Sequence, residues 1–87
     1  MAGLAKALAD TNRLEIMRLL ASQSGPICAC DIVEYLDLSQ PTVSHHLKIL
    51  KEAGLLRASR SGLWMFYSLD PDAARALANL TGLIEAR

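Results

Sequence analysis

Residues 38–50, Leu-Ser-Gln-Pro-Thr-Val-Ser-His-His-Leu-Lys-Ile-Leu, constrain the fold of this 87-residue chain more than any other segment. Ser39 is a good N-cap residue, and Pro41 fits the first turn of a helix, where a missing N–H costs nothing. Because a helix turns by about 100° per residue, three apolar side chains of the segment share one stripe. They are Val43, Leu47 and Leu50. The segment therefore predicts a helix that buries one face.

The remaining surface of this helix offers short polar groups. They are Gln40, Thr42, Ser44, His45 and Lys48, with Ser39 at the N-terminal end. Gln, Ser, Thr and His side chains can bond to base edges in a major groove, and the N-terminal turns of a recognition helix are the part that reaches them. The alternative is an ordinary solvated helix, which more often carries Glu/Lys pairs. We therefore predict a helix that reads DNA.

The charge distribution supports this interpretation, although the net charge of the chain is zero. Residues 39–62 carry Lys48, Lys51, Arg57 and Arg60 against one acidic residue, Glu52. The flanking segments, 1–38 and 63–87, are each net acidic. Phosphate contacts require a local basic surface rather than a high overall pI. We expect these four basic residues to bind the DNA backbone.

Helical periodicity and caps predict three helices before the recognition helix. A short apolar helix is expected at residues 4–9, and Asp10 caps a second at 11–21. In this second helix Leu14, Met17 and Leu20 are expected to face inward. A third helix is expected at about 30–36, and the tight turn at 37–39 leads into the recognition helix. Helix, short turn and polar-faced helix form a helix-turn-helix.

A β-hairpin is expected after Gly54, which suits the end of a helix. Its predicted strands are 55–59 and 63–69, joined at 60–62, and Asp70-Pro71 then starts a final helix. Trp64, Phe66 and Tyr67 are predicted to pack in the core and against the hairpin. The order ααααββα describes a winged helix-turn-helix, mainly α with a small β-hairpin. Residues 1–87 are predicted to form this single DNA-binding domain.

Several segments together resemble the ArsR/SmtB family of bacterial winged-helix repressors. They are residues 8–14, 27–32, 38–47, 52–56 and 62–69, and the most specific are the run Ser-Gln-Pro-Thr-Val-Ser-His-His-Leu and the Cys-x-Cys-Asp before it. The resemblance implies a homodimer joined through its first and last helices. It also implies a protein that binds its operator without inducer and leaves when a metal or metalloid binds. The apolar residues expected at the dimer interface are Leu4, Leu8, Leu77, Leu80 and Ile84.

The two cysteines, Cys28 and Cys30, are the candidate inducer site. On a regular helix they would point about 200° apart, but Pro26 suggests that Cys28 lies at or before the helix start, where the pair can converge. Thiolates suit As(III) or Sb(III), and also Cd(II) or Pb(II). The alternative is a pair of buried small apolar residues. In the arsenic-responsive branch that this chain resembles, a third thiol often follows one turn later; here that residue is Val33.

Other sites and functions are less well supported. The family's second metal site needs histidines on the last helix, and residues 68–87 contain none. His46 lies at the edge of the apolar stripe and is expected to pack in the core. No catalytic constellation or phosphate-binding loop is present, so we expect neither an enzyme nor an organic cofactor. A signal peptide and a membrane span are not expected either, which places the protein in the cytosol. A repressor that answers a non-metal or thiol-redox signal, and a winged helix used for protein contacts, remain alternatives.

Overall fold

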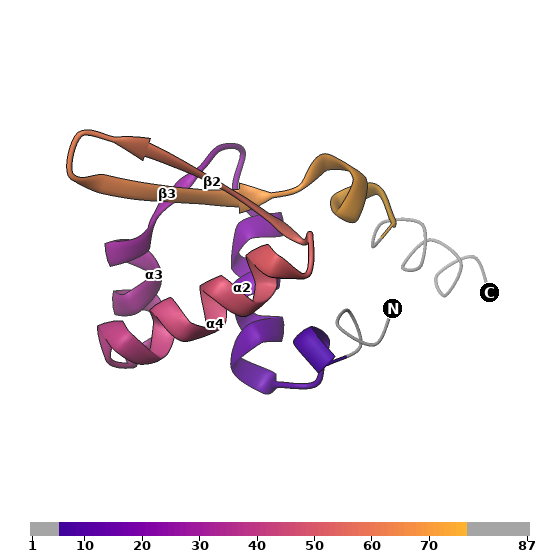
Figure 1. The fold of residues 1–87 in the computed structure, drawn as a ribbon, viewed down its shortest axis with the longest axis horizontal. Helices are drawn as coiled ribbons and strands as arrows, with labels where there is room; N and C mark the ends of the chain where they lie inside the picture. The colour runs from indigo at the N-terminus through magenta and orange to yellow at the C-terminus, as the bar shows by residue number, and fades with distance from the viewer. Residues whose placement is uncertain (1–5, 77–87) are drawn as a thin grey trace.

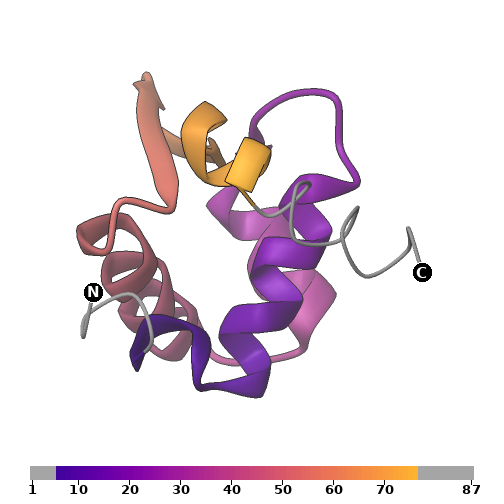
Figure 2. The ribbon, with the colours of Figure 1, turned by 90° about the vertical axis from the view of Figure 1, so that its right-hand side faces the viewer.

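The computed structural model describes residues 6–76, and its elements follow the predicted order (Figure 1). The helices are α2 (Thr11–Ala21), α3 (Ala29–Leu36) and α4 (Gln40–Glu52), and the strands are β1 (Ile27–Cys28), β2 (Leu56–Ser61) and β3 (Trp64–Leu69). Residues 6–8 and 71–76 are also helical. Figure 2 shows residues 6–8, in indigo, beside α2 and the C-terminal end of α4. The predicted fold class, a winged helix-turn-helix, is confirmed.

Local sequence signals set the helix boundaries. The Asp10 carboxylate accepts the N–H groups of Asn12 and Arg13, so α2 begins where the sequence predicted. Ser39 caps α4, whose first turn contains Pro41 as expected. At the other end of α4, Gly54 adopts a φ of 81°, and its N–H donates to the Lys51 carbonyl. This left-handed residue ends α4 and turns the chain toward the sheet.

The sheet has one strand more than predicted. Its order is β1-β3-β2 with both pairs antiparallel, and the short β1 aligns Ile27 with Tyr67 and Cys28 with Phe66. The hairpin turn also lies later than expected, because Ser61 already pairs with Trp64 and only residues 62–63 connect the strands. Gly62 supplies the positive φ, 62°, that this two-residue turn requires. Arg60 therefore belongs to β2 and not to the turn.

The core lies between the three helices and one face of the sheet. Its largest fully buried side chains are Ile16, Ile32, Val43, Leu47 and Leu50. The predicted stripe of α4 is therefore correct. The predicted stripe of α2 is partly wrong: Met17 and Leu20 are buried, but Leu14 is 48% exposed. Ile16, four residues before Leu20, takes its place, so the buried face of α2 is rotated away from Leu14.

The aromatic residues of β3 differ in burial. Tyr67 packs against the core and Phe66 is half-buried, as expected. Trp64 is 57% exposed, which contradicts its predicted packing role. It lies next to the hairpin turn, beyond the reach of the helical core, so nothing covers it fully. Its surroundings are described below.

Most residues predicted for the dimer interface lie outside the described part of the chain. These are Leu4, Leu77, Leu80 and Ile84. Leu8 is described, and it is half-buried against the core. Within residues 6–76, no helix is long and apolar enough to cross a membrane.

Candidate nucleic-acid interface and thiol pair

The side chains predicted to contact DNA all lie on the surface. They are Ser39, Gln40, Thr42, Ser44, His45, Lys48 and Lys51 on α4 and its cap, and Arg57 and Arg60 on β2. The apolar stripe of α4 is buried on the opposite side. The structure thus presents one polar and basic surface formed by α4 and the wing, where the wing is the β2–β3 hairpin.

Two of these polar residues are already bonded to each other. The Ser39 hydroxyl accepts the Thr42 N–H at 3.3 Å and donates to the Thr42 hydroxyl at 2.8 Å. This pair fixes the first turn of α4. Gln40, Ser44 and His45 are exposed beside it, so they are the better candidates for contacts with base edges.

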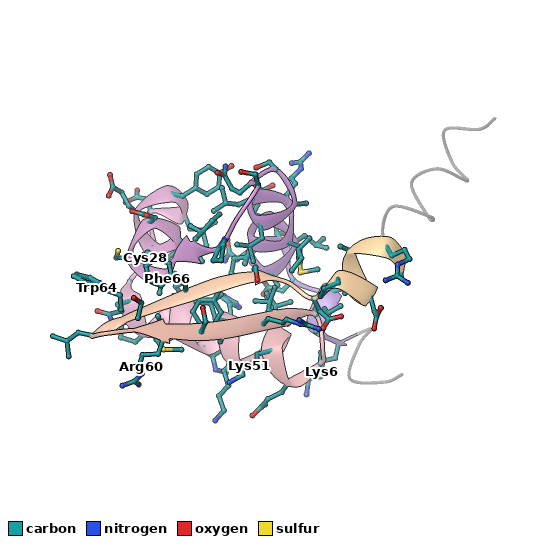
Figure 3. The ribbon with its side chains drawn as sticks, turned by 90° about the horizontal axis from the view of Figure 1, so that it is seen from above. Lys6, Cys28, Lys51, Arg60, Trp64 and Phe66 are labelled. Carbon is teal, nitrogen blue, oxygen red and sulfur yellow. The ribbon has the colours of Figure 1, made fainter. Side chains whose placement is uncertain are left out.

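The two arginines of β2 differ in their surroundings. The Arg57 guanidinium lies 3.2 Å from the Asp70 carboxylate. The Ala73 N–H, together with Arg57 and the Asp72 N–H, holds the pKa of Asp70 below its ordinary value, although burial opposes this. Arg57 is therefore held by an intramolecular ion pair. Arg60 projects from the same edge of the molecule as Lys51 (Figure 3).

Lys6 extends this basic edge, and the sequence reasoning did not single it out. Figure 3 shows Lys6 on the same side as Lys51 and Arg60. A cavity of about 270 Å³ places Lys6 near Glu52 at the end of α4. In the sequence Lys6 belongs to an acidic segment, so only the packing of residues 6–8 beside α4 reveals its position.

A buried polar contact supports α4 from below. His46 is 7% exposed, as its predicted packing role requires. Its Nδ1 atom lies 3.2 Å from Nη1 of Arg13. Arginine has only donors, so Nδ1 accepts and the His46 ring carries its proton on Nε2. The same guanidinium donates to the carbonyls of Lys6 at 3.1 Å and Ala7 at 2.7 Å.

The two cysteines converge at the start of α3. Cys28 is the last residue of β1 and the N-cap of α3, and its Sγ accepts the Cys30 N–H at 3.4 Å. Cys28 is buried, whereas Cys30 is exposed. The neighbouring Cys28 thiol, burial and the charges of Cys28 and Asp31 raise the pKa of Cys30. The prediction that Cys28 lies at the helix start is confirmed, and so the pair escapes the geometry of a regular helix.

The cysteines open onto a cavity of about 380 Å³ that connects three parts of the molecule. From the start of α3 come Cys28, Cys30 and Val33; α4 adds Gln40, Val43, Ser44 and Leu47; the wing adds Leu63, Trp64, Met65 and Tyr67. Figure 3 shows Cys28 and Trp64 at the same end of the molecule. Among residues 6–76, no three His, Cys, Asp or Glu side chains come together as a metal site.

Comparison with known proteins agrees with this geometry. The chain is 44% identical over 75 residues to an uncharacterized HTH-type transcriptional regulator of Methanocaldococcus jannaschii, covering 86% of this chain and 83% of the relative. It is 48% identical over 66 residues to the arsenical resistance operon repressor of Escherichia coli K12, covering 76% of this chain and 56% of that protein. The chain thus matches only somewhat more than half of the Escherichia coli repressor.

A solved structure is similar over nearly the whole chain. It is the homodimeric winged helix-turn-helix DNA-binding domain of a possible ArsR-family transcriptional regulator of Mycobacterium bovis. The two chains superpose with a TM-score of 0.83 at 33% identity, covering 97% of this chain and 77% of the other. The profile described as "Bacterial regulatory protein, arsR family" matches residues 10–58, from the cap of α2 into β2. The family is one of DNA-binding transcriptional regulators and not of enzymes. The chain belongs to the arsR family of bacterial regulatory proteins.

Proposed function

We propose that this protein is a homodimeric repressor that binds operator DNA through α4 and the wing and is released by a thiophilic ion bound at Cys28 and Cys30. The carrying observation is the division of α4 into two faces. Val43, Leu47 and Leu50 are at most 2% exposed, while Gln40, Ser44 and His45 face solvent. A helix held rigidly by its apolar face can present short polar groups to a major groove.

Dimerisation is part of the proposal because one such helix makes few contacts. Two-fold symmetric readers place their recognition helices on half-sites about one turn of DNA apart. The Mycobacterium bovis domain is homodimeric. In this chain the apolar residues of the first and last helices, Leu4, Leu8, Leu77, Leu80 and Ile84, would join the two copies.

The thiol pair supports the choice of inducer. Cys28 and Cys30 are adjacent soft donors at the start of α3, and soft thiolates favour As(III) or Sb(III) over hard cations. The Escherichia coli relative is an arsenical resistance operon repressor. Cd(II) and Pb(II) are thiophilic alternatives. An ion that draws the thiols together would strain the start of α3 and so shift α4, which packs against it.

The reading surface is tested by substituting Ser44 and His45 with Ala. Each lost base contact should reduce the preference for operator over random DNA by about 1–3 kcal/mol. Fluorescence anisotropy with both DNAs across a salt series measures this. Gln23→Ala with Ser24→Ala, a polar exposed pair in the loop before β1, is the matched control and should bind as the wild type. Unchanged operator preference in the Ser44/His45 variant would refute the assigned surface, and salt-independent weak binding would favour a protein-contact module.

The inducer site is tested by Cys28→Ser and Cys30→Ser. Each variant should still bind the operator but should no longer be released by arsenite, because one thiolate cannot hold the ion alone. Val33→Cys should lower the arsenite concentration that releases half of the DNA, since Val33 lines the same cavity as both thiols. Release of the double Ser variant by arsenite, or no release of the wild type, would show that the cysteines only pack.

A further inference from the structure

The cavity beside the thiols has properties that a bare ion would not use. Its volume of about 380 Å³ lies within the range of about 300–1,000 Å³ that holds organic ligands. Apolar side chains from α3, α4 and the wing form much of its lining, including Val33, Leu47 and Trp64. A single ion at Cys28 and Cys30 would leave most of this space to water.

The donor count points in the same direction. Trivalent arsenic forms three bonds, and the described residues offer it two thiols and no group of three metal-binding side chains. An arsenical with one organic substituent supplies its own third bond, from arsenic to carbon. Two thiols therefore complete its coordination without a further protein ligand.

We propose that the cavity binds a trivalent arsenical carrying one aryl group, with arsenic on Cys28 and Cys30 and the aryl group between α4 and the wing. This inference rests on the proposed function, because it requires that the thiols bind arsenic. The reaction is an exchange without oxidation or reduction. An aryl arsenical with two hydroxyl groups reacts with the two thiols; two As–O bonds break, two As–S bonds form, and the hydroxyls leave with the thiol protons as two water molecules.

Two exposed apolar side chains of the wing fit this occupant. Leu63 is 95% exposed and Trp64 is 57% exposed, yet both line the cavity. An aryl group would cover part of their apolar surface, which favours binding. Gln40 and Ser44, which belong to the proposed reading surface, line the same cavity. An aryl group there would contact the surface that reads DNA.

The test compares phenylarsine oxide, methylarsonous acid and arsenite on the full, reduced chain. Exchange of each arsenical between the protein and dithiothreitol cancels the intrinsic strength of the As–S bonds. Because a small apolar group in a fitting pocket is worth about tenfold or more, the phenyl compound should exceed the methyl compound by at least about that factor. Trp64 is the only tryptophan of the chain, so its fluorescence should change with the phenyl compound.

Matched variants locate the preference. Trp64→Gln should remove the phenyl preference, whereas Tyr35→Gln should keep it, because Tyr35 is also 57% exposed but does not line the cavity. Leu63→Ser, in the exposed turn, should also reduce the preference and cannot disturb the core. Circular dichroism verifies that each variant is folded.

The outcomes separate this inference from the proposed function. Equal exchange constants for phenyl and methyl compounds, or a phenyl preference that survives both Trp64→Gln and Leu63→Ser, would overturn the aryl site while arsenic sensing stands. Binding of all three arsenicals that is no tighter in the wild type than in the Cys28→Ser, Cys30→Ser variant would overturn both.

Discussion

Among single side chains, Arg13 does more than its place in α2 suggests. Its guanidinium donates to two backbone carbonyls of residues 6–8 and to the ring of His46 in α4. It therefore joins three helical segments by side-chain hydrogen bonds. His46 is buried, so its Nδ1 has no access to water when this partner is lost.

Arg13→Gln should lower the free energy of unfolding by about 1–3 kcal/mol, because hydrogen bonds from a charged group are lost and a buried acceptor is left unpaired. Urea denaturation followed by circular dichroism measures the change. Arg18→Gln is the control on the same helix: its ion pair with Glu15 is largely exposed, so the loss should stay within about 0.5 kcal/mol. Equal effects of the two substitutions would contradict a connecting role for Arg13.

Among the secondary-structure elements, the wing is where the described geometry refines the predicted DNA contacts most. Arg57 and Arg60 are three residues apart on β2, but only Arg57 is within 3.2 Å of a carboxylate. Arg60 pairs across the hairpin with Met65 and projects from the edge that carries Lys51. The two arginines are thus expected to differ in their availability to phosphate.

Arg60→Ala should weaken binding to all DNA sequences alike and reduce the slope of log K against log salt by about one unit, since one phosphate contact is lost. Arg57→Ala should change the slope less, because Asp70 already neutralises its charge. Titrations of operator and random DNA at several salt concentrations give both slopes. A loss restricted to the operator would instead place Arg60 in a groove, where it reads bases.

For the molecule as a whole, a net charge of zero conceals two opposed surfaces. Exposed acidic residues follow α3, at Asp31, Glu34 and Asp37, whereas α4 and β2 carry the basic ones. Such an asymmetric field orients a protein as it approaches a polyanion. Two copies related by a two-fold axis would present two basic surfaces, so assembly and DNA binding should be linked.

Leu80→Asp should give monomers or unfolded chain, because it places an unpaired charge in the predicted apolar interface. Leu80 lies outside the described residues, so this prediction rests on the sequence pattern alone. Leu63→Asp, at the exposed hairpin turn, is the matched control and should remain dimeric. Sedimentation equilibrium at micromolar concentration decides the matter, and a monomeric wild type would refute the interface. Operator affinity should fall together with the dimer.

The sequence by itself determined the boundaries of the helices and the buried stripe of α4. Asp10 and Ser39 act on N–H groups two or three residues away, and Gly54 acts on its own backbone. Such signals are local, so they can be read without the fold. The convergence of the thiols was predictable for the same reason, since it depends on where α3 begins.

Only the tertiary structure decided which distant groups meet. The pairing of β1 with β3, the ion pair of Arg57 with Asp70 and the contact of Arg13 with His46 each join residues separated in the chain by between 13 and 40 positions. The cavity combines side chains from α3, α4 and the wing. No periodicity or spacing encodes such contacts, because they arise only when the packed helices bring these surfaces together.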